Sequence, residues 1–599
     1  MSLLRLAEQA CFEAFVNCYV QELGAGRWHA ATAWRSERDS SWPGRGSFVV
    51  ELVLPRQAGR LAIDIVYRSA IGRHRCGGVR SELGGAWRDA ERLHAVQALV
   101  QELYAERAPL NAAARAHELE LLFRYVQSQQ LMSRYLEARA HDRALDSDRF
   151  IDSEQSMLYG HWRHPTPKSR QGMTDWQHES FAPELRGRFQ LYYFAVARSL
   201  VRQQSALPES TEQLLSRMLV GDAVAQRALR TAHDRGEVLV PVHPLQVDWL
   251  LHQRHVRSWL ASGLLRDVGR LGQRFTATSS VRTVYSEHAE WMIKLSIPVK
   301  ITNSLRFNRR TELPAGVCMA QVFEALGERA GLRCIADPAY LTVDGPNDSE
   351  SGFELLLREN PFRRGKGGGV YCVAALVQES LPHRASRLRT LLEGLALTEG
   401  RDVEAVSFDW LARYLSCAIQ PLIRLYDEHG IALEAHQQNS LVDVTAGYPR
   451  AFFFRDSQGY YLSNQKRAQL VGLVPELMQR PELFFDDQLI RQRFSYYLMS
   501  NHLFAVVQRL GADGLLDEDA ALALVKRRLT SLRAELNGLG RAFVTSLLDD
   551  STLPYKANLL TRVRDMDELT TELGQAVYVE VPNPLTRPLR ALARELEVA

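Results

Sequence analysis

The sequence has few cysteines, no excess of one charge and no long hydrophobic run, and each absence excludes a class of protein. Seven cysteines are scattered over 599 residues without a C-x-x-C pair, which argues against a zinc or redox site of that spacing and favours buried free thiols. Lysine and arginine total 73 against 70 acidic residues. No global positive excess exists to drive counterion release, so a protein that coats nucleic acid is excluded.

No part of the chain approaches the ~18 uninterrupted apolar residues that a membrane-spanning helix needs. The most apolar stretch, 494–510, is interrupted by polar and charged side chains, and charges also break the apolar run of residues 1–23. The first segment is therefore typical of an amphipathic helix and not of a signal peptide. We expect a cytoplasmic protein with neither a membrane nor a nucleic-acid partner.

Apolar periodicity divides the chain into three regions. Residues 1–145 are mainly helical, and two runs rich in β-branched residues, at 47–54 and 59–67, predict a small sheet. Residues 386–599 are again helical, apart from two strand-like runs on either side of a turn at 446–449 that predict a hairpin.

The region between them, 146–385, is dense in polar motifs. Four runs in it are strand-like by composition, at 238–242, 275–284, 291–301 and 369–376. The chain contains no G-x-x-x-x-G-K-[ST], H-E-x-x-H or G-x-S-x-G, and no G-x-G-x-x-G between a strand and a helix. The common phosphate-loop, zinc-protease, serine-hydrolase and dinucleotide motifs are therefore absent.

Two polar segments in the middle region suit anions. The loop 160–172 holds two histidines, three cations and two prolines; prolines pre-fix a backbone, and arginine can clamp a carboxylate through two hydrogen bonds. A solvated basic turn is the alternative. The segment 279–283 places hydroxyls beside Arg282, which suits phosphate oxygens, although an exposed strand is the simpler interpretation of this segment in isolation.

Lys294 lies inside a strand-like run, where alternation predicts that it shares a face with Met292 and Ser296. An unpaired buried charge is costly, so this lysine needs an anionic partner. A triphosphate would serve as that partner, and so would a buried aspartate or glutamate.

The predicted hairpin carries a further polar cluster. Glu434 and Gln438 precede its first strand, and Asp456 follows its second. Antiparallel pairing would bring Asp456 back toward them, and two carboxylates with an amide oxygen are hard ligands of the kind that Mg²⁺ prefers. The alternative is a capped turn with His436 in the core.

Taken in order, these motifs resemble the NRPS-independent siderophore synthetases of the IucA/IucC (aerobactin synthetase-like) family. The resemblance covers about 160–584, and its specificity lies in the ordered set, since each block alone is weak. Leu245 departs from the Trp that many members carry, and we expect it to alter packing while the chemistry is retained. The matching blocks are His164-Pro165-x-x-Lys168-x-Arg170, His243-Pro244-Leu245-Gln246, Ser280-x-Arg282-Thr283, Lys294-Leu295-Ser296-x-Pro298 with Thr302 and Arg306, Glu434-x-His436-x-Gln438-Asn439 and Arg455-Asp456.

The resemblance implies an α+β fold shaped like a cupped hand, with three lobes rich in helices and antiparallel sheets. Residues 1–145 would be the thumb, 146–385 the fingers and 386–599 the palm, with ATP between fingers and palm. It also implies two steps: a carboxylate attacks the α-phosphorus of ATP, and an amine or hydroxyl then displaces AMP. Members are often homodimers.

Three sets of residues follow from the resemblance. The nucleotide is assigned to Ser280, Arg282, Thr283, Lys294, Arg306, His436, Gln438 and Asn439. Mg²⁺ is assigned to Glu434 and Asp456, with Gln438 as a further ligand. The carboxylate substrate is assigned to His164, Lys168, Arg170, Thr302, Arg306 and Lys556. The residues expected to act on the reacting groups are His164, Arg306 and His436.

The substrates stay open at this point. Citrate is the commonest carboxylate in the family, but some members activate a citrate mono-amide or a succinyl-hydroxamate for oligomerisation or macrocyclisation. A non-catalytic protein that binds a nucleotide or a ferric siderophore is the alternative from another class. A ferric-siderophore reductase would need a cysteine cluster near the C-terminus, and the last cysteine is Cys417.

Overall fold

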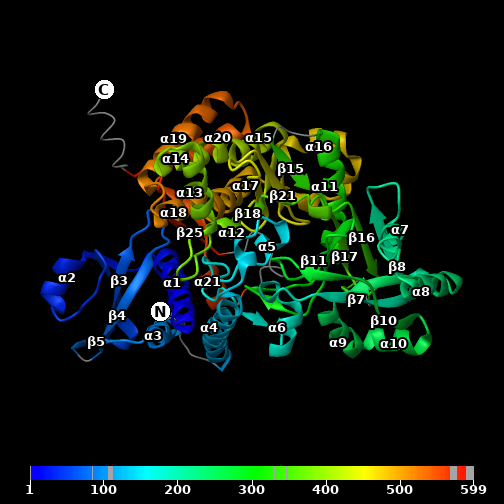
Figure 1. The fold of residues 1–599 in the computed structure, drawn as a ribbon, viewed down its shortest axis with the longest axis horizontal. Coiled ribbons are helices and arrows are strands. Elements are labelled where there is room, and N and C mark those ends of the chain that lie inside the picture. The colour runs from blue at the N-terminus through cyan, green and yellow to red at the C-terminus, as the bar shows by residue number, and fades with distance from the viewer. Residues whose placement is uncertain are drawn as a thin grey trace.

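The computed structural model describes residues 2–83, 85–105, 112–327, 331–345, 349–564, 566 and 577–587. Three large apolar cores lie in the N-terminal, middle and C-terminal parts of the chain. Figure 1 shows the corresponding parts around a common centre, with the N-terminal sheet in blue and the C-terminal helices in yellow and orange. The α+β class is confirmed.

The N-terminal part is an antiparallel sheet in the order β1-β2-β3-β4-β5, with helices packed against it. The first helix begins at Ser2, whose hydroxyl accepts from the Arg5 N–H, and ends at Gly24 in the left-handed conformation. Both predicted strands are confirmed as β2 and β3. The elements are α1 (Leu3–Leu23), β1 (Arg27–Ala30), α2 (Ala31–Arg38), β2 (Phe48–Leu54), β3 (Gly59–Tyr67), β4 (Arg75–Leu83), β5 (Trp87–Asp89), α3 (Arg92–Ala105) and α4 (Ala112–Arg139).

An eight-stranded sheet forms the middle part, in the order β8-β16-β17-β12-β11-β10-β7-β9, and every neighbouring pair is antiparallel. A three-stranded sheet, β14-β13-β6, lies apart from it. The elements are α5 (Phe150–Glu154), β6 (Arg170–Gln171), α6 (Asp175–Phe181), β7 (Phe189–Ala197), β8 (Val201–Ser205), α7 (Thr211–Arg217), α8 (Ala223–Asp234), β9 (Glu237–Val242), α9 (Pro244–His252), α10 (Arg254–Ser262), β10 (Leu265–Ala277), β11 (Thr283–Tyr285), β12 (Trp291–Leu295), β13 (Lys300–Ile301), β14 (Ser304–Leu305), α11 (Leu313–Leu326), β16 (Ala339–Val343) and β17 (Leu355–Glu359).

Three predicted strands are too long. The run 275–284 breaks at a turn between β10 and β11, where the N–H of Val281 donates to the carbonyl of Thr278 (2.9 Å). The run 291–301 divides into β12 and β13, with Pro298 between them. In the run 369–376 only the first residues are extended, because the residues that follow form a helix whose apolar side chains pack into the C-terminal core.

The C-terminal part packs helices around small sheets, and two helices contain π-helical turns at Leu415–Ile419 and Ser495–Leu503. The predicted hairpin is confirmed as β20 and β21. The elements are β15 (Leu332–Ile335), β18 (Val370–Cys372), α12 (Val373–Val377), α13 (Arg387–Glu399), α14 (Val403–Tyr414), α15 (Gln420–His429), β19 (Ile431–Leu433), β20 (Ser440–Asp443), β21 (Ala451–Arg455), β22 (Tyr460–Ser463), α16 (Arg467–Leu473), β23 (Phe484–Phe485), α17 (Asp487–Phe494), α18 (Phe504–Ala512), α19 (Glu518–Glu535), α20 (Leu539–Asp549), β24 (Thr552–Lys556), α21 (Asn558–Val563) and β25 (Tyr578–Pro582).

One sheet joins segments from both sides of the predicted boundary at 385. Its order is β15-β21-β20-β18, and the β15–β21 pair is parallel. The chain therefore enters the C-terminal core before residue 385, and the division into three domains stays a prediction. All seven cysteines are free thiols, six of them buried, as expected. Within the described ranges no helix is both long and apolar enough to cross a bilayer.

Candidate active site

A cavity of about 690 Å³ lies where the three parts of the chain meet. Its lining includes all fifteen residues that the sequence predicted for the site, although they come from segments spread over almost 400 positions. These are His164, Lys168, Arg170, Ser280, Arg282, Thr283, Lys294, Thr302, Arg306, Glu434, His436, Gln438, Asn439, Asp456 and Lys556.

Positive charge is concentrated in this cavity. Ten lysine and arginine side chains line it against six aspartates and glutamates, whereas the whole chain has 73 against 70. A cleft with one dominant sign of charge attracts ligands of the other sign. The lining therefore suits a polyanion.

The turn between β10 and β11 presents Ser280, Arg282 and Thr283. Val281 between them has a φ of +67°, an uncommon conformation for a β-branched residue, and its side chain is buried in the core of the eight-stranded sheet. The Ser280 hydroxyl accepts from the N–H of Thr283 (3.1 Å). Burial, with Arg306 nearby, lowers the pKa of Arg282 to about 10.

Lys294 projects from β12 into the cavity, where its partner is the half-buried carboxylate of Asp456. Its ammonium pairs with Asp456 Oδ1 at 2.9 Å and donates to the hydroxyl of Ser457. Burial lowers the pKa of Lys294 to about 8, although Asp456 favours the charged form. The predicted phosphate-binding lysine and the predicted metal carboxylate thus form one ion pair.

His436 is held as a neutral hydrogen-bond donor. The backbone N–H groups of Gln438 and Asn439 both donate to its Nδ1 at 3.3 Å, so the ring proton resides on Nε2. Burial lowers the pKa of His436 to about 3, with Asp456 opposing the shift. The neutral ring can donate from Nε2 to an anionic oxygen.

The hairpin brings Glu434 and Asp456, the two predicted Mg²⁺ ligands, within electrostatic reach of each other. Asp456 Oδ2 accepts from Asn439 Nδ2 (3.3 Å), and Glu434 accepts from the Tyr461 hydroxyl. Burial raises the pKa of Glu434, and Asp456 adds to the rise. A divalent cation would relieve this repulsion, and two carboxylates fit Mg²⁺ that arrives with phosphates. Among the described residues no group of three or more His, Cys, Asp or Glu could hold a metal by itself.

The loop 160–172 is buried, which excludes the solvated turn. At Gly160, with a φ of +76°, an added Cβ would meet the Pro167 carbonyl at 2.2 Å, so glycine is required for the loop to close on itself. Glu184 accepts from Arg170 at 2.6 and 2.8 Å and also pairs with Lys168. Two predicted carboxylate-binding cations therefore already share one buried partner.

A short sheet connects this loop to the next predicted residues. In β6 and β13, Arg170 pairs with Ile301, which places Thr302 and Arg306 beside the loop. Arg306 Nη2 donates to the Thr302 hydroxyl at 2.7 Å. His164 accepts at Nδ1 from the Thr166 N–H (3.1 Å), so its Nε2–H faces Asn303 Oδ1 at 3.2 Å.

Lys556 lies in a different setting from the one expected, whereas Leu245 lies in a packing position. Lys556 stands 6.0 Å from the centre of the Tyr497 ring and opposes the burial that raises the pKa of Glu434, so it lies on the predicted metal side of the cavity. Leu245 is buried in the core of the eight-stranded sheet, and its N–H donates to His243. The block around Leu245 therefore packs the middle part and does not line the cavity.

Several cavity residues were missed by the sequence analysis. Arg455 stands in a matching block without an assigned role, and the others lie outside the motifs. Arg358 pairs with the buried Asp337 at 2.6 Å and approaches Asp456 at 3.8 Å. The charged lining residues to which the sequence assigned no role are Arg73, Glu154, Glu184, Glu312, Arg358, Arg455, Glu482 and Arg493.

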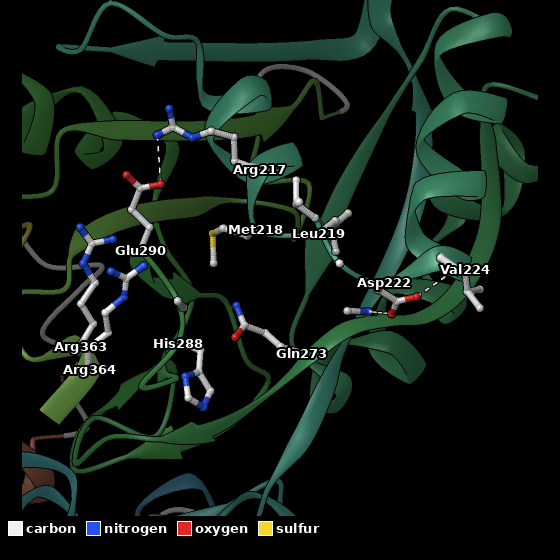
Figure 2. A pocket seen from close by; sticks show the side chains of 15 residues that line it. Arg217, Met218, Leu219, Asp222, Val224, Gln273, His288, Glu290, Arg363 and Arg364 are labelled. Carbon is white, nitrogen blue, oxygen red and sulfur yellow. Dashed lines mark hydrogen bonds and ion pairs between the residues drawn. The ribbon is translucent and has the colours of Figure 1, made fainter.

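A second groove, of about 890 Å³, lies between the α7–α8 connection and the turns that carry His288 and Arg363 (Figure 2). Arg217 pairs there with Glu290 at 3.1 Å. None of the fifteen predicted site residues lines this groove. It is therefore separate from the candidate active site.

Comparison with known proteins identifies the class. The model of the IucA / IucC family matches residues 149–378, and that of the ferric iron reductase FhuF-like transporter matches 409–571. A spermidine-citrate ligase of Bacillus anthracis is 35% identical over 97% of this chain and 98% of its own. A rhizobactin siderophore biosynthesis protein, RhbC, of Rhizobium meliloti is 36% identical over 90% and 93%.

The same architecture occurs in a solved structure of ATP-bound aerobactin synthetase IucA from Klebsiella pneumoniae. The TM-score is 0.84, with 24% identity over 97% of this chain and 100% of that one. The family and its relatives named as ligases define an ATP-dependent ligase of siderophore biosynthesis. The chain belongs to the IucA/IucC family of NRPS-independent siderophore synthetases. The segment 409–571 has one cysteine, Cys417, too few to ligate an iron–sulfur cluster.

Proposed function

We propose that this chain adenylates citrate in the candidate active site and joins the activated carboxyl to an amine. One observation carries the proposal: a single cation-rich cavity combines a hydroxyl–arginine turn and a carboxylate pair with a basic loop. Two anions must be brought together in the first step, so neutralisation is the main requirement. Citrate is the carboxylate named for the 35% identical relative.

In the first step a citrate carboxylate oxygen attacks the α-phosphorus, forming the acyl–phosphate bond while the bond to pyrophosphate breaks. Ser280, Arg282 and Thr283 would hold phosphate oxygens, and Lys294 would leave Asp456 to meet them. Arg306, beside Thr302, would neutralise the carboxylate as it approaches. When bound, Mg²⁺ would offset phosphate charge, with Glu434 and Asp456 as its protein ligands.

In the second step the amine nitrogen attacks the acyl carbon, AMP leaves with the acyl–oxygen electron pair, and the nitrogen passes its proton to the departing phosphate or to water. The Nε2–H groups of His164 and His436 would donate to negative oxygens in this step. The amine class is supported by the relative named for spermidine. A reaction that consumes ATP suits the cytoplasm. The homodimer stays a prediction that sedimentation would test.

Pyrophosphate release tests the proposal directly. The protein is mixed with ATP and Mg²⁺ and with citrate, a citrate mono-amide or a succinyl-hydroxamate, and hydroxylamine traps the acyl-adenylate. Citrate should give the fastest release, and adding spermidine or another amine should replace the trapped product by an amide. Release with a different carboxylate would change the substrate. No release with any member of the panel would favour a non-catalytic binding protein.

A further inference from the structure

Glu154 lies between the two sides of the nucleotide site and has no part in the chemistry proposed above. It is the last residue of α5, is 1% exposed and lines the cavity. Its carboxylate accepts from Arg455 Nη2 at 2.8 and 2.9 Å. It also accepts from the backbone N–H (3.1 Å) and the hydroxyl (2.8 Å) of Ser279. One carboxylate thus joins the neighbour of Ser280 to the neighbour of Asp456.

These contacts close into a hydrogen-bonded ring. Arg455 Nη2 also donates to the carbonyl of Gln438 at 3.0 Å, and Gln438 Nε2 donates to the Ser279 hydroxyl at 3.4 Å. Hydrogen bonds therefore link four segments of the chain, at residues 154, 279, 438 and 455, beside the predicted phosphate-binding turn. Hydrogen bonds to charged groups are about twice as strong as neutral ones, and Arg455 is only 5% exposed, so losing its partner would be costly.

The helix α5, which carries Glu154, contacts both the eight-stranded sheet and the sheet β15-β21-β20-β18. Phe150 stacks on Phe362 at 4.1 Å and meets the edge of Tyr285 at 5.4 Å. The hydroxyl of Ser153 accepts from the N–H of Cys372 at 3.4 Å. Tyr285 belongs to the eight-stranded sheet, and Cys372 belongs to the sheet β15-β21-β20-β18. Figure 1 shows α5 in cyan between these parts.

We infer that Glu154 is a positioning residue that fixes the phosphate-binding turn at 279–283 relative to residues 455–456. The inference rests on the proposed function, because it concerns the same Mg·ATP site. When Glu154 links the turn 279–283 to residues 455–456, the side chains of both segments contact the triphosphate in one fixed geometry. A misplacement of about 1 Å can cost about 10²-fold in rate. In the carboxylate loop, Lys168 and Arg170 pair with a different buried carboxylate, that of Glu184.

Glu154→Gln tests the inference, since it keeps the side chain's size and removes its charge. The KM for Mg·ATP in pyrophosphate release should rise about 10-fold, while the KM for citrate changes less than about twofold. Calorimetric affinity for Mg·ATP alone should fall by the same factor. A merely structural role would lower the melting temperature and the active fraction without separating the two KM values.

Glu237→Gln is the matched control. Glu237 is a buried glutamate in β9 that pairs with Arg266 (2.7 Å) and Arg235 (3.0 Å), and it does not line the cavity. Neither KM should change. If Glu154→Gln does not fold, Ser279→Ala removes one link of the ring and should raise the same KM by about threefold.

Unchanged Mg·ATP affinity in Glu154→Gln, or an equal rise in both KM values, would overturn the inference. If Ser279→Ala has to stand in, its unchanged KM for Mg·ATP would do the same. Failure of the proposed function is distinguishable, because a wild-type protein that binds Mg·ATP but activates no carboxylate still allows the calorimetric comparison.

Discussion

Two sides of the cavity hold lysine and arginine side chains in different settings. The first is the side proposed for the carboxylate substrate, at the loop 160–172, and the second is the side proposed for the nucleotide, at the turn 279–283. On the first, Lys168 and Arg170 share the buried carboxylate of Glu184. On the second, Arg282 donates to the neutral Asn308 Oδ1 at 2.9 Å and feels the repulsion of Arg306. Removing the carboxylate partner of a buried cation is destabilising, whereas neighbouring cations are stabilised by an incoming anion. On the nucleotide side, Arg282 and Arg306 therefore favour new negative charge, while Lys294 already pairs with Asp456.

The largest effect that this comparison predicts is on stability. Glu184→Gln should lower the free energy of unfolding by about 3–5 kcal/mol, because it leaves two buried cations without their partner. Burial alone would raise the pKa of Glu184, but Arg170 and Lys168 outweigh it and hold the pKa far below 4.5. This contribution is present above pH 4.5 and is lost as the pH falls through the folded-state pKa.

Urea denaturation at neutral pH measures this change. Glu179→Gln is the control, since Glu179 is an exposed partner of Arg134 at 3.1 Å, and its loss should cost less than about 1 kcal/mol. An equal loss of unfolding free energy in the two variants would show that Glu184 does not stabilise the loop 160–172.

Arg306→Ala should lower turnover by at least ~10²-fold, or about 2.7 kcal/mol of transition-state stabilisation. The melting temperature should stay within a few degrees, because Arg306 donates to two neutral oxygens, the Ile301 carbonyl and the Thr302 hydroxyl. Arg309→Ala, three residues on, is outside the cavity lining and should keep its turnover. Near-normal activity of Arg306→Ala would remove this residue from the reaction.

Lys294→Ala should weaken ATP binding by about 10-fold, or about 1.4 kcal/mol. The loss is smaller than for Arg306 because Lys294 must first leave Asp456. Calorimetry with Mg·ATP measures it. Lys300→Ala is the control, since Lys300 pairs with Glu120 at 3.8 Å. Unchanged affinity in Lys294→Ala would show that this lysine only neutralises Asp456.

The smallest predicted effect concerns the metal. Glu434→Gln should raise the Mg²⁺ concentration for half-maximal activity several-fold, because it removes one of two carboxylate ligands. Glu312→Gln also changes a carboxylate of the cavity lining and should leave the metal titration in place. The same titration for Glu434→Gln and the wild-type protein would contradict the carboxylate pair.

Local patterns were sufficient for much of the fold. The strands at 48–54 and 59–67 and the hairpin at 440–455 follow from β-branched runs and turn residues. The run 275–284 failed because the strained turn at Val281 depends on burying that side chain in a distant core. The ordered motifs also identified fifteen residues that one cavity brings together.

The sequence by itself determined which residue types could carry anion and metal chemistry, because those types recur at short spacings. Only the tertiary structure decided the partner of each charge. Lys294 meets Asp456 across 162 positions, and Glu154 meets Arg455 across 301. Pairing at such separations is set by how sheets and helices pack, and burial then fixes whether a charge braces the fold or awaits a ligand.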